Sequence, residues 1–151
     1  MKKIIFLCFC ATLFIAGISS CSKQNSNPDL TTNLVGNYSG SILDTSAGSP
    51  STSTTGVIVS VTKIDNTHIQ VTPSTGYIPF TAILTSAPNG VYLTTQSGTY
   101  NGIAYVGSQF INNLTAPVNG LYNSTTNQIT YSLLGVQSGA YGYEVYLGTH
   151  Q

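Results

Sequence analysis

The stretch that decides the fold consists of two alternating runs joined by a turn, namely Ile78-Pro79-Phe80-Thr81-Ala82-Ile83-Leu84, then Pro88-Asn89-Gly90, then Val91-Tyr92-Leu93. In both runs apolar residues occupy every second position, which predicts strands with one buried face and one solvent-facing face. Asn-Gly is a strongly favoured dipeptide in tight hairpin turns, because both residues adopt positive φ readily. The stretch therefore predicts two antiparallel strands that lie side by side.

The same alternation runs through the rest of the chain and predicts about nine short strands. The further positions with this period are Leu34, Tyr38 and Ile42; Val57, Val59 and Val61; Ile69 and Val71; Ile103 and Tyr105; Val118 and Tyr122; Ile129, Tyr131 and Leu133; Tyr143, Val145 and Leu147. No longer window has the spacing of an amphipathic helix. The short spacing between strands favours antiparallel hairpins over crossover helices. The sequence thus predicts one all-β domain, a single antiparallel meander β-barrel of about eight to nine strands, with a sandwich as the alternative.

Turn residues separate the predicted strands. Asn101-Gly102 repeats the hairpin dipeptide, whereas Asn119-Gly120 lies inside a strand-like run and predicts either a second hairpin turn or a β-bulge. Asp65-Asn66 predicts a tight turn in which the aspartate side chain caps its own backbone.

Residues 1–20 have the layout of a secretory signal peptide. Lys2 and Lys3 precede an apolar run over residues 4–18, which is shorter than the roughly 20 residues that a permanent membrane-spanning helix needs. The run ends in Ile18-Ser19-Ser20-Cys21, which resembles the bacterial lipobox. The resemblance implies that Cys21 receives diacylglycerol and becomes the first residue of the mature protein. The alternative is an ordinary cleaved signal with an incidental cysteine.

Residues 21–33 are predicted to be the lipidated cysteine and a flexible polar tether, and residues 34–151 the β-barrel domain. After removal of the leader, two lysines stand against four carboxylates, a formal charge of −2, and the chain has no arginine. Two lysines cannot neutralise a run of phosphates, so composition excludes nucleic-acid binding. Cys8 and Cys10 leave with the leader, so the domain has no disulfide and depends on burial for its stability.

Candidate catalytic and metal-binding residues are few. The chain has two histidines, which together with four scattered carboxylates are a thin ligand supply for a metal ion, and it has no Gly-x-Ser-x-Gly motif. Asp29 falls in the predicted tether and Asp65 in a predicted turn. Glu144 lies between two residues of the predicted buried face, which predicts that its carboxylate points outward. The sequence therefore predicts neither an enzyme nor a cofactor or metal site.

Tyrosine is the most frequent aromatic residue, with ten in the chain. Five tyrosines share the phase of the apolar positions: Tyr38, Tyr105, Tyr122, Tyr131 and Tyr143. The simpler interpretation is that they pack in the core, with each hydroxyl bonded to the backbone. The functional interpretation is that, with Phe80, they line the mouth of a barrel that holds one small ligand. Tyr92 and Tyr146 fall on the opposite phase and are predicted to face outward.

Three segments resemble the small lipocalin-like or calycin-like lipoproteins of Bacteroidota, namely Leu34-Val35-Gly36-Asn37-Tyr38-Ser39-Gly40, Asn127-Gln128-Ile129-Thr130-Tyr131-Ser132-Leu133 and Glu144-Val145-Tyr146-Leu147-Gly148-Thr149. The resemblance covers most of residues 34–151 and implies a small meander barrel. One hypothesis is a lipid-anchored envelope protein whose barrel binds a small apolar or amphipathic ligand. The other is a non-enzymatic structural or interaction module with a filled barrel, which binds protein or glycan through its Tyr/Ser/Thr-rich outer face.

The membrane connection is predicted to be the lipid on Cys21. By analogy with known lipoproteins, Ser22 directly after the cysteine favours the outer membrane. Residues 22–25 carry no acidic run, so the domain is expected to face the periplasm, with surface display as the alternative. The lipobox and the short strands argue against a membrane-spanning barrel.

Overall fold

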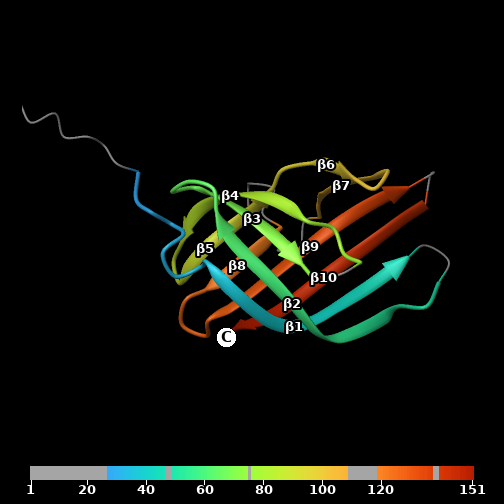
Figure 1. Ribbon diagram of the computed structural model, residues 1–151, viewed down its shortest axis with the longest axis horizontal. Coiled ribbons are helices and arrows are strands. Elements are labelled where there is room, and N and C mark those ends of the chain that lie inside the picture. The colour runs from blue at the N-terminus through green and yellow to red at the C-terminus, as the bar shows by residue number, and fades with distance from the viewer. Residues whose placement is uncertain (1–26, 47–48, 75, 109–118, 138–139) are drawn as a thin grey trace, which may run out of the picture.

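The computed structural model describes residues 27–46, 49–74, 76–108, 119–137 and 140–151, which form one antiparallel β-sheet (Figure 1). Its strands are β1 (Gly36–Ser46), β2 (Thr52–Lys63), β3 (His68–Pro73), β4 (Phe80–Ala87), β5 (Gly90–Thr95), β6 (Gly98–Tyr100), β7 (Ile103–Gly107), β8 (Gly120–Asn123), β9 (Gln128–Gln137) and β10 (Ala140–His150). The predicted all-β antiparallel fold is confirmed. In this part of the chain no helix is long and apolar enough to cross a membrane.

Eight of the strands close into a ring. Their hydrogen-bonded order is β10-β1-β2-β3-β4-β5-β8-β9, and β9 also pairs with β10, so the order is circular. β8 and β7 share the other edge of β9: β8 pairs with its first part, up to Tyr131, and β7 with its second part, from Leu133. β6 pairs with β7 outside the ring (Figure 1). Because β6 has only three residues, it was too short to produce an alternating pattern.

The hairpin turn between β4 and β5 lies within the predicted segment Pro88-Asn89-Gly90. Its two central residues, however, lie one position earlier than the Asn-Gly dipeptide predicts. Ala87 pairs with Gly90, so the two central residues are Pro88 and Asn89. Gly90 has a φ of 149°, and a Cβ there would lie 1.9 Å from the carbonyl oxygen of Tyr122. The glycine is therefore required by the close approach of β8, which is a tertiary constraint that the turn motif does not contain.

Asn101-Gly102 joins β6 to β7 with φ values of 48° and 81°, as a type I′ turn requires. Asn119-Gly120 is not a hairpin turn. The backbone of Asn119 donates to the carbonyl of Leu93 (3.1 Å) and accepts from the amide of Ser132 (2.8 Å), so it continues the pairing of β8 with both neighbours. The Asn119 side chain is buried and accepts from the amide of Thr95 (2.6 Å) while donating to the carbonyl of Ser132 (3.1 Å).

The inner face of the ring is a continuous hydrophobic core, and most of the predicted alternation is confirmed there. The buried positions that the period predicted are Leu34, Tyr38, Ile42, Val57, Val59, Val61, Ile69, Val71, Ile78, Phe80, Ala82, Leu84, Val91, Leu93, Tyr122, Ile129, Tyr131 and Leu133. Aromatic rings occupy its centre: Tyr131 stacks on Tyr146 with ring centroids 5.2 Å apart and meets the edge of Phe80 at 4.8 Å. Large side chains therefore fill the described interior of the ring.

The phase predicted for β10 is wrong. Tyr146 is fully buried, whereas Tyr143 and Leu147 are 45% and 49% exposed. The hydroxyl of Tyr146 donates to the carbonyl of Tyr38 at 3.0 Å, and Gly148 makes room for it, since a Cβ there would lie 2.1 Å from the hydroxyl oxygen. Both faces of β10 carry apolar residues, so the period alone could not choose between them. With the phase reversed, Glu144 points into the ring instead of outward.

Candidate functional site

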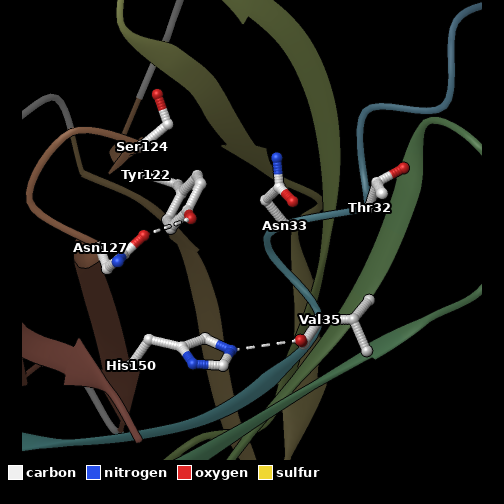
Figure 2. A pocket seen from close by; sticks show the side chains of 7 residues that line it. All are labelled: Thr32, Asn33, Val35, Tyr122, Ser124, Asn127 and His150. Carbon is white, nitrogen blue, oxygen red and sulfur yellow. Dashed lines mark hydrogen bonds between the residues drawn. The ribbon is translucent and has the colours of Figure 1, made fainter.

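A cleft of about 440 Å³ opens at one end of the ring (Figure 2). Its lining residues are Thr32, Asn33, Val35, Tyr122, Ser124, Asn127 and His150. They come from the segment before β1, from β8 and the β8–β9 turn, and from the last residue of β10. Figure 1 shows these segments gathered at the end of the sheet where the C-terminus lies. The volume lies within the usual range of small-ligand pockets.

The segment before β1 is held against the strands by Asp29. Its carboxylate accepts from the amide (3.0 Å) and hydroxyl (2.6 Å) of Thr31 and forms an ion pair with Lys63 of β2 at 2.5 Å. The hydrogen bond from Lys63, with those from Thr31, lowers the pKa of Asp29 to about 2. Leu30 also donates its backbone N–H to the carbonyl of Asn66. Residues 29–33, predicted as part of the tether, thus contact the strands and present Thr32 and Asn33 at the cleft.

The opposite wall is the four-residue turn between β8 and β9. The carboxamide oxygen of Asn123 accepts from the amides of Thr125 (2.9 Å) and Thr126 (3.3 Å), which closes the turn. Asn127 adopts a φ of 53° and accepts a hydrogen bond from the hydroxyl of Tyr122 at 3.2 Å. Ser124 donates its hydroxyl to the carbonyl of Asn89 (3.1 Å), which ties the turn to the β4–β5 hairpin.

His150 forms the floor of the cleft in Figure 2. Its Nε2 lies 3.3 Å from the carbonyl oxygen of Val35, and its ring meets the edge of Tyr38 with centroids 4.9 Å apart. Gly36 permits this contact, because a Cβ there would lie 2.3 Å from Nε2. The imidazole therefore contacts Val35, directly before β1, and Tyr38 of β1.

The cleft offers hydroxyl, carboxamide and imidazole groups, and none of its lining residues carries a carboxylate or an amine. Ser124 and His150 lie on different sides of it (Figure 2), and the hydroxyl of Ser124 donates to a backbone carbonyl rather than to the imidazole. This arrangement provides hydrogen bonds to a neutral ligand and no activated nucleophile. In the described ranges no three His, Cys, Asp or Glu side chains gather as a metal site would require.

The predicted aromatic site residues do not converge on this cleft. Tyr38, Phe80 and Tyr131 are buried in the core, and Tyr105 is packed against its edge. Tyr143 faces outward, contrary to prediction, and only Tyr122 borders the cleft. The lipidation residue, Cys21, lies outside the described residues. The predicted cap in the β2–β3 turn is present, because Asp65 accepts from the amide of Thr67 at 2.7 Å. This bond, together with the hydrogen bonds to the side chains of His68 and Thr67, lowers the pKa of Asp65 to about 2.

The sequence did not predict that Asn33, Asn127 and His150 line one cleft. Each lies next to a turn or a chain end and carries no motif, and the contact between His150 and Val35 spans 115 positions. Comparison of the chain with protein-family models, curated proteins and solved structures finds no significant match.

Proposed function

We propose that the protein is a lipid-anchored envelope protein that binds a neutral, hydroxyl-rich ligand, such as a short saccharide, in the cleft at the end of the ring. The observation that supports the proposal is the chemistry of the cleft lining, which offers hydrogen-bond donors and acceptors but no carboxylate or amine side chain. The polar lining residues are Thr32, Asn33, Ser124, Asn127 and His150. Sugar hydroxyls both donate and accept, and carboxamide and hydroxyl side chains match them in both roles.

The packed interior supports the filled-barrel hypothesis over a barrel that holds an apolar ligand in its lumen. Tyr38, Phe80, Tyr131 and Tyr146 are at most 1% exposed and lie in mutual contact or in contact with the same core. An eight-stranded barrel either fills its lumen with side chains or holds one small ligand. In a lipocalin-like barrel with a filled centre, ligand sites lie at the ends of the ring, and the cleft lies at one of them.

The proposed anchor would hold the cleft near a membrane. Cys21 carries the lipid, and seven residues separate it from Asp29, which the ion pair with Lys63 fixes beside the cleft. With the predicted tether composition, seven residues would have an r.m.s. reach of about 15 Å. The cleft is therefore expected to meet ligands close to the bilayer, in the outer membrane and on its periplasmic side.

Calorimetric titration tests the proposal. The full chain, purified in a polyoxyethylene detergent that contains no sugar, is titrated with N,N′-diacetylchitobiose, cellobiose and maltose. We expect at least one disaccharide to bind, and Asn33→Ala to weaken it about tenfold, as loss of one or two hydrogen bonds implies. The matched control is Gln96→Ala, an exposed change directly after the end of β5 that is far from the cleft, and it should leave the affinity unchanged.

Two results would overturn the proposal. One is the absence of binding for all three disaccharides up to high millimolar concentration. The other is equal loss of affinity in Asn33→Ala and Gln96→Ala, because a site in the cleft depends on the first residue and not on the second.

A further inference from the structure

The end of the ring opposite the cleft contains two inward-facing carboxylates and an inward-facing phenol. Asp44 of β1 pairs with Glu144 of β10, so their side chains share the inner face. Tyr131 of β9 is a diagonal neighbour of Glu144, since it pairs with Tyr146 two residues further along β10. Glu144 is six residues before His150, about 20 Å along the strand from the cleft.

Two polar atoms of this cluster have no hydrogen-bond partner in the described structure. They are the hydroxyl oxygen of Tyr131 and Oε2 of Glu144, and both are buried. Tyr131 is fully buried as a residue, and the nearby Glu144 charge contributes to raising its pKa after burial itself. Buried polar groups are almost always satisfied in proteins, so these two orphaned oxygens, at diagonal positions on neighbouring strands, indicate a bound polar group that satisfies them.

In the described part of the chain no lysine or arginine faces the two carboxylates. Lys63, the one lysine that the described ranges contain, is paired with Asp29 at the opposite end of the ring. Burial raises the pKa of Glu144 to about 7, a backbone hydrogen bond from Ile78 opposes the rise, and the charge of Asp44 adds to it. Among the described residues, the ionised form of Glu144 therefore has no lysine or arginine beside it.

The inward row next to Glu144 has no side chains on β9 and β10. Gly142 of β10 pairs with Gly135 of β9, in the row next to Glu144 on the side away from the cleft. Ile78 and Ile103 lie over Gly135, since a Cβ there would be 3.6 Å and 3.2 Å from their side chains. Glu144 itself is only half-buried. Apolar side chains thus flank a carboxylate that solvent reaches in part.

We propose that this end of the ring is a second binding site, which takes the primary ammonium group of a small organic cation with an apolar body. The ammonium donates hydrogen bonds to Glu144 Oε2 and to the hydroxyl oxygen of Tyr131, with the Asp44 carboxylate close by. The apolar body packs against Ile78 and Ile103. A primary ammonium has three donors and satisfies both orphaned oxygens as acceptors. A metal ion is a poorer occupant, because the described residues gather no set of three such ligands.

The test is calorimetric titration of the full chain in the same detergent with phenethylamine and, as its neutral counterpart of similar shape, 2-phenylethanol. We expect phenethylamine to bind at least tenfold more tightly than the alcohol at pH 8. Its affinity should fall about tenfold from pH 8 to pH 6, because the carboxyl with a pKa of about 7 takes up a proton that competes with the ligand. The other titratable groups described at this end are Asp44, Tyr105, Tyr131 and Tyr146, and burial raises the pKa of Tyr131 and Tyr146 above the ordinary value of 10.

Two variants locate the site. Glu144→Gln should abolish both the preference for the amine and the pH dependence, whereas Tyr131→Phe should weaken the amine severalfold and keep the pH dependence. Asn33→Ala should leave amine binding unchanged, which separates this site from the proposed saccharide cleft. The proposal is overturned if amine and alcohol bind equally or neither binds, or if wild-type affinity is the same at pH 6 and pH 8. All three outcomes are measured on the wild type, so they test the proposal even if Glu144→Gln fails to fold.

Discussion

The hydroxyl of Tyr146 on the last strand donates a hydrogen bond to the backbone carbonyl of Tyr38 on the first strand, at 3.0 Å and across 108 positions of the sequence. The bond lies inside the ring beside the β1–β10 pairing that closes it. Tyr146→Phe should therefore lower the free energy of unfolding by about 1 to 2 kcal/mol. Urea denaturation followed by circular dichroism measures this, with the exposed Tyr143→Phe as the control, for which we expect a change within about 0.5 kcal/mol. Equal effects of the two variants would mean that the hydroxyl of Tyr146 does not stabilise the closed ring.

Asn119 is predicted to be the most sensitive polar residue of the fold. Its side chain bridges β5 and β9 through Thr95 and Ser132 and is 1% exposed. Asn119→Ala leaves the buried amide of Thr95 without that acceptor, so we expect a loss of about 2 to 4 kcal/mol. Asn123→Ala, at the partly exposed end of β8, is the matched control and should cost less than half as much. A loss below about 1 kcal/mol in Asn119→Ala would show that water replaces the bridge.

The pH dependence of stability should bear the sign of a raised carboxyl pKa. Glu144 has an ordinary value of 4.5 and a folded value of about 7. The folded state therefore holds the proton more tightly, and stability falls as the pH rises from about 5 to about 7 and then levels off. After allowance for partial solvent screening, the loss is about 2 kcal/mol.

Urea titrations of wild type and Glu144→Gln at pH 5 and pH 8 test this. The variant lacks the ionisable group, so it should gain stability relative to wild type at pH 8 and show little difference at pH 5. A constant difference at both values would assign the pH effect to other groups. Asp29 and Asp65, whose pKa values are lowered to about 2, act only below about pH 4, where their stabilising interactions are lost.

The proposed lipid anchor predicts a change of cell fraction. Cys21→Ala removes the thiol that receives the lipid, and the mature chain should then leave the membrane pellet after a carbonate wash. The wild-type protein should stay in the pellet. Each acyl-chain methylene buried in the bilayer adds about 0.8 kcal/mol to membrane binding, and a lipoprotein carries two or three acyl chains. A Cys21→Ala protein that remains in the pellet would contradict the anchor. Cys8→Ala is the control, and its fraction should not change.

Local pattern was sufficient where one face of a strand is polar. In β2, Val57, Val59 and Val61 alternate with threonine, serine and isoleucine, and the period correctly assigned the buried face. In β10 the alternatives were Tyr143, Val145 and Leu147 against Glu144 and Tyr146, and both sets contain large apolar groups. The choice depended on space, because Gly148 admits the Tyr146 hydroxyl only on the inner face. Glu144 was misplaced for the same reason.

The sequence by itself determined the all-β class, the position of the β4–β5 hairpin and the inner face of most strands, because turn chemistry and side-chain alternation are local properties. Only the tertiary structure decided the closure of the ring between β1 and β10, the burial of Tyr146 and Glu144, and the meeting of Asn33, Asn127 and His150 at the cleft. These features bring together residues about a hundred positions apart. Which face of a strand is buried depends on the side chains that compete for the same space. The pKa of a buried carboxyl depends on how much water reaches it.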